Sequence, residues 1–572
     1  MDFKKSFSIL FFLAIVALTA AVKKKPTDEP VVSLQEGIVK GAWKLSTNGR
    51  YYASFEGIPY AKPPLTIMRL QDPWPPLPWQ GIYDATYARN VCMQYNPFQD
   101  KVIGSEDCLF VNVYTPHVRD CANMPVMVFI HGGAFMFGSG SSHGPQNFMD
   151  FNFVVVTLNY RLGPLGFLST YDNIISGNFG LKDQSLALRW TRDNIKTFGG
   201  NPDTVLLSGS SAGAASVHYH YLSPWSKGLF SSGFQASGTA FSSWAHQTKP
   251  LEKAKELADV VKCPYITSKE LLQCLQEIPG EDIVMAQIDV TKKQTGWRPF
   301  LFTAFVPSIE APSVKKPFLN NYPHVLTTAG AMHRLPLIAS ITAQEGLYPA
   351  ATFITDPKCL DDLERRWNTL ASYIFVYNDT LPKERLVEVA QKIKQEYFES
   401  WPVHKETFHL LIEALSDRLF NADIAKQAQL HALKSGQLVF FYKYTYRGSI
   451  SISNDMAQNK ENYGVAHADD IFNIFKFQLA PFSTSTDKKM AYNLIDILYN
   501  FATTGVPKLK KGIWQPLNAC SCPEIRYLEI ASPTDMKMKV ESNFGRHSFW
   551  HNIGFLEYDL FKLPKPPGKD EL

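Results

Sequence analysis

The sequence lacks an excess of charge of either sign. Its 57 lysines and arginines are nearly matched by 53 aspartates and glutamates, which leaves a formal net charge of +4 over 572 residues. The basic residues are also scattered along the chain, whereas a nucleic-acid-binding domain concentrates them on one face or along one helix. The composition therefore predicts that nucleic acid is not a partner of this protein.

Long apolar runs are scarce as well, and the one at the N-terminus has a specific pattern. The chain begins MDFKKSFSILFFLAIVALTAAVKKK, in which two lysines precede an apolar stretch at 7–18 and small residues follow it. This pattern is typical of a secretory signal peptide, which we assign to residues 1–21. The alternative is a membrane anchor, but a spanning helix needs about 20 consecutive apolar residues and no run in the sequence is that long. We therefore expect no transmembrane anchor.

The C-terminus carries a second targeting pattern. The chain ends in KLPKPPGKDEL, and residues 569–572 match the address that the endoplasmic-reticulum (ER) retrieval receptor reads. The proline- and glycine-rich residues before it predict a flexible tail over 565–572, because proline cannot continue a helix. A chance tetrapeptide is the alternative, but the two ends of the chain agree with each other. They predict a protein of the ER lumen, partly secreted, with the retrieval receptor as a partner.

The cysteines form no metal-binding pattern. None of the eight shows the spacing of a zinc site with nearby histidines, and we expect neither a metal nor a cofactor. Eight cysteines instead suit an oxidising compartment. Cys520 and Cys522 are too close in the chain for an easy bridge to each other. The single N-x-S/T sequon, at Asn378, predicts at most one standard N-glycan.

No internal repeat, Ser/Gly linker or shift of composition divides the chain, so we expect one large domain over residues 22–564. Near-continuous apolar runs read as strands buried on both faces, and they lie at 125–130, 153–158, 204–209, 335–341 and 437–444. Residues 182–198 place Leu186, Trp190 and Ile195 near helical spacing. This alternation predicts the α/β class, with a large, mostly parallel central sheet covered by helices on both faces.

One predicted strand runs into GSSAG at 209–213, a G-x-S-x-G pattern centred on Ser211. The central residue of this pattern lies on a strained strand-to-helix turn, where small neighbours let the backbone pass. The helix that follows directs its N-terminal amides at the reacting carbon, where negative charge develops. Ser211 is then a nucleophile, while Ser210 points away from the direction of attack. A tight turn with no catalytic role is the alternative, since a five-residue match alone is modest evidence.

A second motif, HGGA at 131–134, follows the predicted strand at 125–130. Loops of this type supply backbone N–H groups to an oxyanion. A serine nucleophile also needs a base, and the base needs an acid that orients it. Two parts of the same machinery in the expected order favour a serine hydrolase over a small-residue turn.

On these motifs the sequence resembles the type-B carboxylesterases, in the carboxylesterase/cholinesterase branch of the α/β-hydrolase fold, and it looks closest to the insect-type carboxylesterases. The matching stretches cover nearly the whole mature chain: FEGIPYAKPP (55–64), SEDCLFVNVYTP (105–116), NYRLGPLGFLS (159–169), GNFGLKDQSLALRW (177–190), NIKTFGGNPDTV (194–205), GSSAGAASV (209–217) and FATTGVPK (501–508). The resemblance implies a serine carboxylic-ester hydrolase.

The resemblance also implies a triad. Ser211 would be the nucleophile, Glu345 in AQEG the acid and His467 in YGVAH the base, which is the chain order of the α/β-hydrolases. His467 would take the Ser211 proton and return it to the leaving alcohol, while Glu345 holds the imidazole in place. Without the family match His467 could be a surface histidine, since the chain has 14 histidines.

By the same match the backbone amides of Gly133, Ala134 and Ala212 would form the oxyanion hole. Each such donor lowers the activation free energy by about 3 kcal/mol. Ala134 stands where the family often has glycine, a change that keeps the amide donor. The implied disulfides and structural ion pairs are Cys92–Cys108, Cys263–Cys274, Arg69–Glu106 and Arg161–Asp183. The resemblance assigns no partner to Cys121, Cys359, Cys520 and Cys522.

Two departures from the family bear on the substrate. Cholinesterases have a tryptophan in the loop between the first two cysteines, where a quaternary ammonium stacks on it, and here that loop (93–107) has none. The residue before the nucleophile is often acidic in the family, and here it is the uncharged Ser210. Both changes remove attraction for a cation, so we expect a small neutral ester as the substrate.

Trp244, in ASGTAFSSWAHQ, matches the position that lines the acyl pocket of related insect-type esterases, where a large ring would limit acyl bulk. The alternative is a core tryptophan, since this residue type is commonly buried. Two other functions stay open. One is a hormone or pheromone esterase of narrow specificity, although juvenile-hormone esterases usually have Gln where Ser210 stands. The other is a catalytically inert adhesion-type member, although such members usually lack the nucleophile or the base.

We predict that the last four residues retain the protein in the cell. A chain that ends at Gly568 lacks the address that the retrieval receptor recognises. When it is expressed beside the full chain, most of its esterase activity should move from the cells into the medium. Equal secretion of the two chains would contradict the ER assignment and leave the predicted chemistry untouched.

Overall fold

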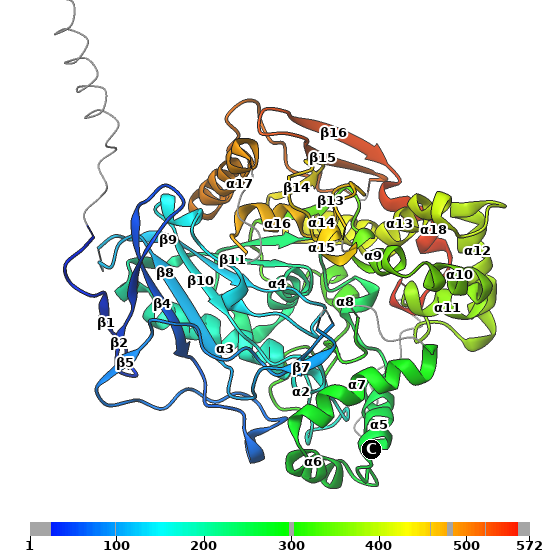
Figure 1. Cartoon of the computed structure of the whole chain (residues 1–572), viewed down its shortest axis with the longest axis horizontal. Helices are drawn as coiled ribbons and strands as arrows, with labels where there is room; N and C mark the ends of the chain where they lie inside the picture. The colour runs from blue at the N-terminus through cyan, green and yellow to red at the C-terminus, as the bar shows by residue number, and fades with distance from the viewer. Residues whose placement is uncertain are drawn as a thin grey trace, which may run out of the picture.

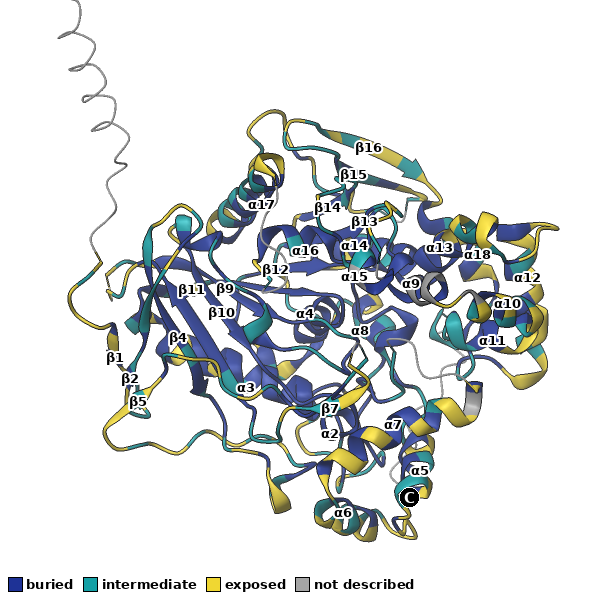
Figure 2. Ribbon diagram, viewed as in Figure 1, coloured by how far each residue is buried: buried dark blue, intermediate teal, exposed yellow. Residues whose placement is uncertain are grey.

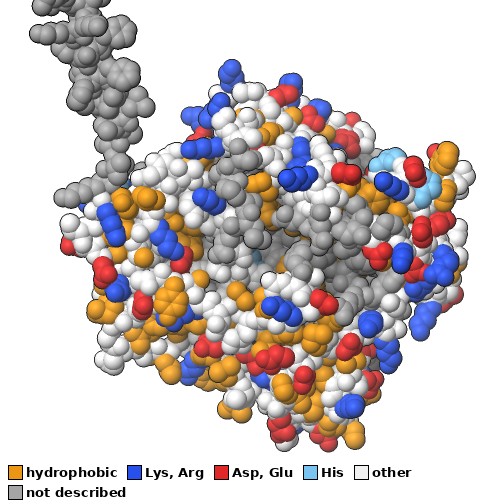
Figure 3. All heavy atoms as spheres, in the orientation of Figure 1, with side chains coloured by type: hydrophobic (Ala, Val, Ile, Leu, Met, Phe, Trp, Pro, Cys, Tyr) orange, Lys and Arg blue, Asp and Glu red, His pale blue; other side chains and the backbone are white. Residues whose placement is uncertain are grey.

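The computed structural model of the chain describes residues 25–97, 99–119, 121–296, 302–457, 459–477, 484–520 and 522–558. The predicted signal peptide (1–21) and the predicted C-terminal tail (565–572) lie outside these residues. Within the described ranges, none of the helices is both long enough and apolar enough to cross a membrane. On the face drawn in Figure 3, positive and negative side chains are interspersed, in keeping with the near-balanced composition.

An 11-stranded central sheet runs through the described part of the chain (Figure 1). Its strands lie in the order β16 (Met536–Ser542), β15 (Glu524–Ile530), β14 (Val439–Tyr444), β13 (Leu337–Thr342), β12 (Ser232–Ala236), β11 (Gly200–Ser210), β9 (Met124–Ile130), β10 (Val154–Leu158), β8 (Phe110–Thr115), β4 (Tyr51–Pro59) and β3 (Ala42–Leu45). The strands from β10 to β15 pair in parallel, and antiparallel pairs occur only toward the two edges of this sheet. The predicted large, mostly parallel sheet is therefore confirmed.

The alternation of side chains explains why the central strands are apolar throughout. In β9, Val126, Val128 and Ile130 belong to the core on one face of the sheet, and Met127 and Phe129 belong to the core on the other. A strand with a core on each face has no polar side, so it reads as a continuous apolar run. All five predicted strands are present, as β9, β10, β11, β13 and β14.

Helices cover both faces of the sheet. On the face of Val128 lie α3 (Phe179–Asn194), α4 (Ala212–Leu222) and α14 (Ala422–Ser435), and on the face of Phe129 lie α16 (Asp469–Ile474) and α17 (Ser485–Thr504). The helix predicted at 182–198 corresponds to α3, which continues into a 3-10 turn, η4 (Ile195–Phe198). Figure 2 shows the central strands buried and the outer helices exposed on one side. The core therefore lies in two layers, one on each face.

The remaining elements surround this arrangement. The other strands are β1 (Val31–Ser33), β2 (Ile38–Lys40), β5 (Ile82–Asp84), β6 (Gln94–Asn96) and β7 (Lys101–Ile103). The other helices are α2 (Gly163–Phe167), α5 (Pro250–Val261), α6 (Ser268–Glu277), α7 (Gly280–Thr295), α8 (Pro323–Thr328), α9 (Leu347–Thr355), α10 (Pro357–Arg365), α11 (Trp367–Ile374), α12 (Leu386–Phe398), α13 (Phe408–Ser416), α15 (Ile452–Ala457) and α18 (His547–Asn552). In Figure 1 the group α5–α7 lies at the bottom and the group α10–α12 at the right.

Two ion pairs hold loops near the sheet. Arg69 donates to both carboxylate oxygens of Glu106, at 2.7 and 2.5 Å. Arg161 likewise donates to both oxygens of Asp183, at 2.8 and 2.7 Å, and both of these residues are buried. Bidentate geometry of this kind gives strong, directional pairs. These are the pairs that the resemblance implies, and their polar groups are engaged with each other.

The disulfides include one that we did not expect. The pairs implied by the resemblance are present as Cys92–Cys108 and Cys263–Cys274. Our expectation that Cys520 and Cys522 cannot bridge easily is wrong, because the two are joined, with their Cα atoms 5.3 Å apart. That separation lies within the range of about 4.4–6.8 Å that disulfides span, so closeness in the chain is no obstacle. Cys121 and Cys359 are free thiols.

Candidate active site

Ser211 occupies the tight turn between β11 and α4, at the C-terminal end of a central strand. Its backbone has φ 58° and ψ −121°, in the positive-φ region that side chains rarely adopt. Its N–H donates to the carbonyl oxygen of Ala236, the last residue of β12, at 2.8 Å. The neighbouring strand therefore holds the turn in this strained shape, which presents the Ser211 side chain beyond the edge of the sheet.

The glycines that flank Ser211 are a steric requirement of this turn. A Cβ atom on Gly209 would lie 2.3 Å from the carbonyl oxygen of Gly213. A Cβ atom on Gly213 would lie 2.0 Å from the carbonyl oxygen of Ile130, at the end of β9. No side chain fits at such distances, so the G-x-S-x-G spacing follows from the close approach of β9, β11 and α4.

The loop after β9 packs directly against Ser211. A Cβ atom on Gly132 would lie 2.9 Å from the Cβ atom of Ser211. Gly133, with φ +106°, and Ala134, with φ 52°, then turn the backbone sharply. A side chain on Gly133 would collide with the carbonyl oxygen of Phe137, 1.9 Å from its Cβ position. The loop is thus shaped so that its amides lie beside the serine.

Three backbone amides around Ser211 have no hydrogen-bond acceptor among the described residues. The backbone N–H groups of Gly133, Ala134 and Ala212 donate to no other residue in the described part of the chain. Ala134 and Ala212 are also almost fully buried. A buried backbone N–H without a partner is rare and costly in a folded protein. These are the donors that the resemblance places in an oxyanion hole, where a developing negative charge would satisfy them.

Glu345 lies just after β13, and both of its carboxylate oxygens are engaged. Oε1 accepts hydrogen bonds from the hydroxyl of Ser237 and from the N–H of Thr342, each at 2.6 Å. Oε2 contacts Nδ1 of His467 at 2.5 Å. Glu345 is fully buried, so its charge depends on these partners rather than on water. The structure therefore brings the predicted acid and the predicted base into direct contact.

His467 has one free ring nitrogen. With Nδ1 bonded to Glu345, the described residues offer no hydrogen-bond partner to the buried Nε2 atom. The ring is held between Tyr348 and Phe420, whose centroids lie 5.1 and 4.6 Å away. A carboxylate that accepts from Nδ1–H leaves the lone pair on Nε2, which is the atom able to take a proton.

Sequence reasoning missed the residues that join these parts. The N–H of Gln344 donates to the carbonyl oxygen of Val465 at 2.9 Å, and its side-chain Oε1 accepts from the N–H of Val465 at 2.6 Å. These two bonds tie the loop of Glu345 to the loop of His467. Ser237, which binds Glu345, is followed by Gly238, where a Cβ atom would lie 2.2 Å from the carbonyl oxygen of Ser211. No motif marks these residues, because tertiary contacts alone give them their roles.

His131, at the start of the HGGA loop, is held as a neutral structural group. Burial lowers the pKa of His131 to about 4. Its Nδ1 bonds the carbonyl oxygen of Gly132 at 2.8 Å, and its ring stacks on Tyr160. In the described ranges, no group of three or more His, Cys, Asp and Glu side chains, with or without His131, is arranged to hold a metal.

Trp244 is buried and lies one ring away from His467. Its Nε1–H donates to the carbonyl oxygen of Leu419 at 2.7 Å, and its ring packs on Phe420, which contacts His467. Trp244 also borders a cavity of about 110 Å³, together with the half-buried Asn378 of the sequon. In the described part of the chain, the residues that line this cavity do not include Ser211, Glu345 or His467. The burial of Trp244 supports the core description, and its contact with Phe420 is what brings it near His467.

Comparisons with known proteins find chains that are similar to this one over nearly its whole length. Residues 28–550 match the model of the carboxylesterase family. The chain is 41% identical over 559 residues to venom carboxylesterase-6 of Apis mellifera, which covers 96% of this chain and 98% of that protein. It is 36% identical to esterase E4 of Myzus persicae, over 91% of this chain and 95% of that protein. The crystal structure of juvenile hormone esterase from Manduca sexta, with OTFP covalently attached, superposes with a TM-score of 0.79 at 27% identity, over 92% of this chain and 99% of that chain.

We predict that replacing Ser211 abolishes ester hydrolysis. Ser211→Ala removes the hydroxyl oxygen that we expect to form the acyl bond, so kcat should fall by at least roughly 10⁴-fold. Labelling of the protein by an organophosphate should disappear as well. The matched control is Ser210→Ala, which changes the adjacent hydroxyl and should keep most of the activity and the labelling. An inactive Ser210→Ala beside an active Ser211→Ala would reverse the assignment.

Proposed function

The chain belongs to the carboxylesterase family and is a carboxylic-ester hydrolase, and we propose that it cleaves small neutral esters through an acyl-enzyme on Ser211. The observation that carries this proposal is the bond of 2.5 Å between Glu345 and Nδ1 of His467, with Nε2 buried and unbonded among the described residues. A histidine held in this way is prepared to accept one proton from a nearby hydroxyl and to release it later.

The proposed reaction has two halves. In the first, Nε2 of His467 takes the hydroxyl proton of Ser211 while Oγ attacks the ester carbonyl, and the tetrahedral oxyanion is bound by the free amides of Gly133, Ala134 and Ala212. Collapse expels the alkoxide, which receives the proton from Nε2 and leaves as the alcohol. In the second half, water loses a proton to Nε2 and attacks the acyl carbon, and Ser211 recovers its proton as the carboxylic acid leaves. Glu345 stays ionised and stabilises the imidazolium in both halves.

The preference for a neutral ester rests on the residues that a cationic substrate would need. The loop closed by Cys92 and Cys108 contains no tryptophan, so this loop offers no indole face to a quaternary ammonium. Ser210 replaces the acid that often precedes the nucleophile in the family. The carboxylate of Glu345 is already hydrogen-bonded to Nδ1 of His467.

We predict that kcat/KM is roughly tenfold or more higher for 3,3-dimethylbutyl butyrate than for butyrylcholine, since the two have the same shape and differ in charge. Both are assayed on the same enzyme, at low and high salt, so that long-range attraction is separated from contact at the site. A higher kcat/KM for the choline ester at both salt concentrations would refute the neutral-ester proposal.

We further propose that Trp244 limits the size of the acyl group, because it packs on Phe420 beside the proton-accepting histidine. Trp244→Leu should raise kcat/KM for p-nitrophenyl octanoate relative to p-nitrophenyl acetate by roughly tenfold, as expected for several methylenes gaining room. Trp514→Leu is the matched control, since Trp514 is equally buried but lies in the core of the opposite face. It should lower stability and leave the ratio unchanged. An unchanged ratio in Trp244→Leu would make Trp244 a core residue only.

One narrower function has an observation in its favour. The similarity to juvenile hormone esterase of Manduca sexta suggests a hormone ester as an alternative substrate, which would be cleaved by the same mechanism. Ser210 argues against it, as the juvenile-hormone esterases usually have Gln at this place. Assaying the purified protein on methyl esters of graded acyl length, with a juvenile hormone among them, distinguishes a broad esterase from a narrow one.

The location proposed for this activity is the ER lumen. It rests on the two terminal sequence patterns, which lie outside the described residues. The three disulfides are in keeping with an oxidising compartment.

A further inference from the structure

A basic groove lies far from Ser211. Its volume is about 620 Å³, and it lies between the C-terminal half of α3, the turn η5 (Pro224–Ser226) that follows α4, and the segment 315–320. Five of the side chains that line it are cationic, namely Arg189, Arg192, Lys227, Lys315 and Lys316. None of the described residues that line it is acidic.

Most of these cations have no ion-pair or hydrogen-bond partner among the described residues. Arg192 pairs with its exposed chain neighbour Asp193, at 3.0 Å. The other four side chains form no ion pair and no hydrogen bond within the part of the chain that the structure describes. The whole sequence has 57 basic and 53 acidic residues, so a lining with five cations and no acid departs from its average. Such cations repel one another until an anion lies between them.

The groove has an apolar floor. Trp225 is half-buried in the lining, where it is joined by two prolines and a leucine. Its Nε1–H donates to the carbonyl oxygen of Lys316 at 3.0 Å, which fixes the indole against the lysine segment. A concave site with apolar walls and a few charged groups is typical of sites for small organic ligands, and its volume lies in their usual range.

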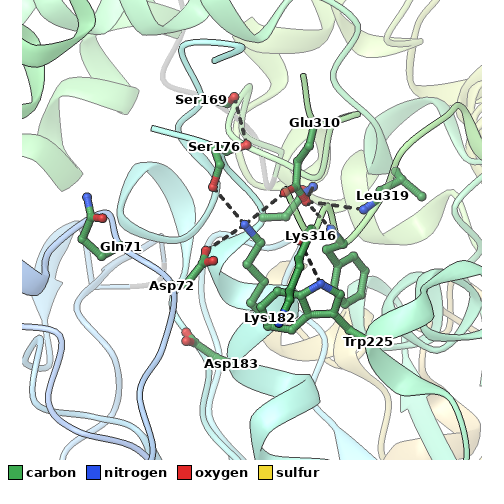
Figure 4. A network of polar contacts seen from close by, with 12 residues as sticks. Gln71, Asp72, Ser169, Ser176, Lys182, Asp183, Trp225, Glu310, Lys316 and Leu319 are labelled. Carbon is green, nitrogen blue, oxygen red and sulfur yellow. Dashed lines mark hydrogen bonds and ion pairs between the residues drawn. The ribbon is translucent and has the colours of Figure 1, made fainter. Parts of the chain in front are cut away.

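The segment that carries Lys315 and Lys316 is anchored by buried polar contacts on its inner side (Figure 4). Lys182, fully buried on α3, contacts Asp72 at 2.8 Å and the buried Glu310 at 3.1 Å. Glu310 in turn accepts from the N–H groups of Phe318 and Leu319, at 2.9 and 3.4 Å. The segment is thus anchored to the same helix that supplies the two arginines. The two sides of the groove therefore keep a fixed spacing, which favours binding because little is left to order.

We propose that this groove binds an amphiphilic organic anion, that is, one carboxylate, sulfate or phosphate group on a short apolar body. Arginine and lysine at the rim would bind the anionic head by charge-assisted hydrogen bonds. The body would lie on Trp225 and its apolar neighbours. Neither a purely inorganic anion nor a neutral lipid would use both parts of the groove.

The groove lies outside the catalytic machinery. Ser211 precedes the first residue of α4, whereas η5 follows the last, and the 11 residues of α4 span about 16 Å. Arg189 and Arg192 likewise lie in the last two turns of α3. A ligand in the groove is therefore separate from an ester at Ser211, and the inference does not depend on the proposed substrate.

The test compares octyl sulfate binding to three forms of the full-length protein by calorimetry. The groove variant is Lys227→Gln with Lys316→Gln, whose side chains are exposed and whose backbone bond to Trp225 is kept. The control variant is Lys510→Gln with Lys511→Gln, an exposed pair that changes the net charge equally and does not line the groove. The wild type and the control variant should bind alike, and the groove variant roughly tenfold or more weakly. All three should hydrolyse p-nitrophenyl acetate at the same rate.

Further probes identify the ligand chemistry. Octanoate and octyl phosphate compare the possible head groups on the same body, while octanol removes the charge and inorganic sulfate removes the body. Each octyl anion that binds more weakly to the groove variant than to the control variant supports the proposal and ranks its head group. Four results would overturn it. Two concern octyl sulfate: equal affinity for all three proteins, or an affinity for the control variant that is as low as that for the groove variant. Two concern the other probes: a loss of octanol affinity in the groove variant as large as that of the octyl anions, or an affinity of the wild type for inorganic sulfate as high as that for octyl sulfate. Absence of any octyl sulfate binding to the wild type at millimolar concentration would overturn it too.

Discussion

The arrangement of this site depends on backbone crowding around Ser211. Gly132, Gly209 and Gly213 lie where any Cβ atom would meet another atom at 2.0–2.9 Å, so three chain segments approach more closely than side chains allow. This close approach places the strained serine beside the HGGA loop and its free amides. A φ of 58° at Ser211 is unfavourable by itself, and the bond from its N–H to the carbonyl oxygen of Ala236 helps to hold it. The proposed nucleophile is thus positioned by the backbone contacts of its turn with the sheet.

The proposed acid and base are positioned by a different principle, the pairing of buried polar groups. A buried carboxylate is costly unless hydrogen bonds surround it, and Glu345 has Ser237, Thr342 and His467 for this purpose. Beneath it, burial raises the pKa of Asp470 to about 6, although the hydroxyl of Tyr442 donates to it at 2.7 Å. The absence of a hydrogen-bond partner for Nε2 of His467 among the described residues then becomes informative. Both carboxylate oxygens of Glu345 and Nδ1 of His467 are engaged, so Nε2 is the atom of this pair that remains for the proposed proton transfer.

The sequence allowed those parts of the protein to be predicted whose cause is local. Continuous apolar runs follow from strands with a core on each face, and the glycines around Ser211 follow from a turn too tight for side chains, so both could be recognised before the structure. Glu345 and His467 could be found only through resemblance to a family, because nothing in AQEG or YGVAH differs from an ordinary loop. Ser237, Gln344 and Phe420 were not predictable, since their roles arise from strands and loops that meet only in the fold. The error at Cys520 and Cys522 has the same origin, as bridging depends on the distance between Cα atoms and not on the number of residues between them.

Lys182 links helix α3 to the wall of the groove through its contact with Glu310. It lies on α3, within the stretch GNFGLKDQSLALRW that carries the family resemblance, and next to Asp183, which pairs with Arg161. Burial raises the pKa of the Glu310 carboxyl, and the nearby Lys182 cation opposes that shift. Removing one partner of such a buried pair typically costs about 3–5 kcal/mol, because the other charge is left without compensation. Replacing both by apolar residues could be neutral for stability, yet it would release the N–H groups of Phe318 and Leu319 and with them the segment of Lys315 and Lys316. The ion pair of Lys182 and Glu310 is therefore explained by the segment that it orients. An apolar pair could fill the same space but could not hold the groove wall that carries Lys315 and Lys316 in place.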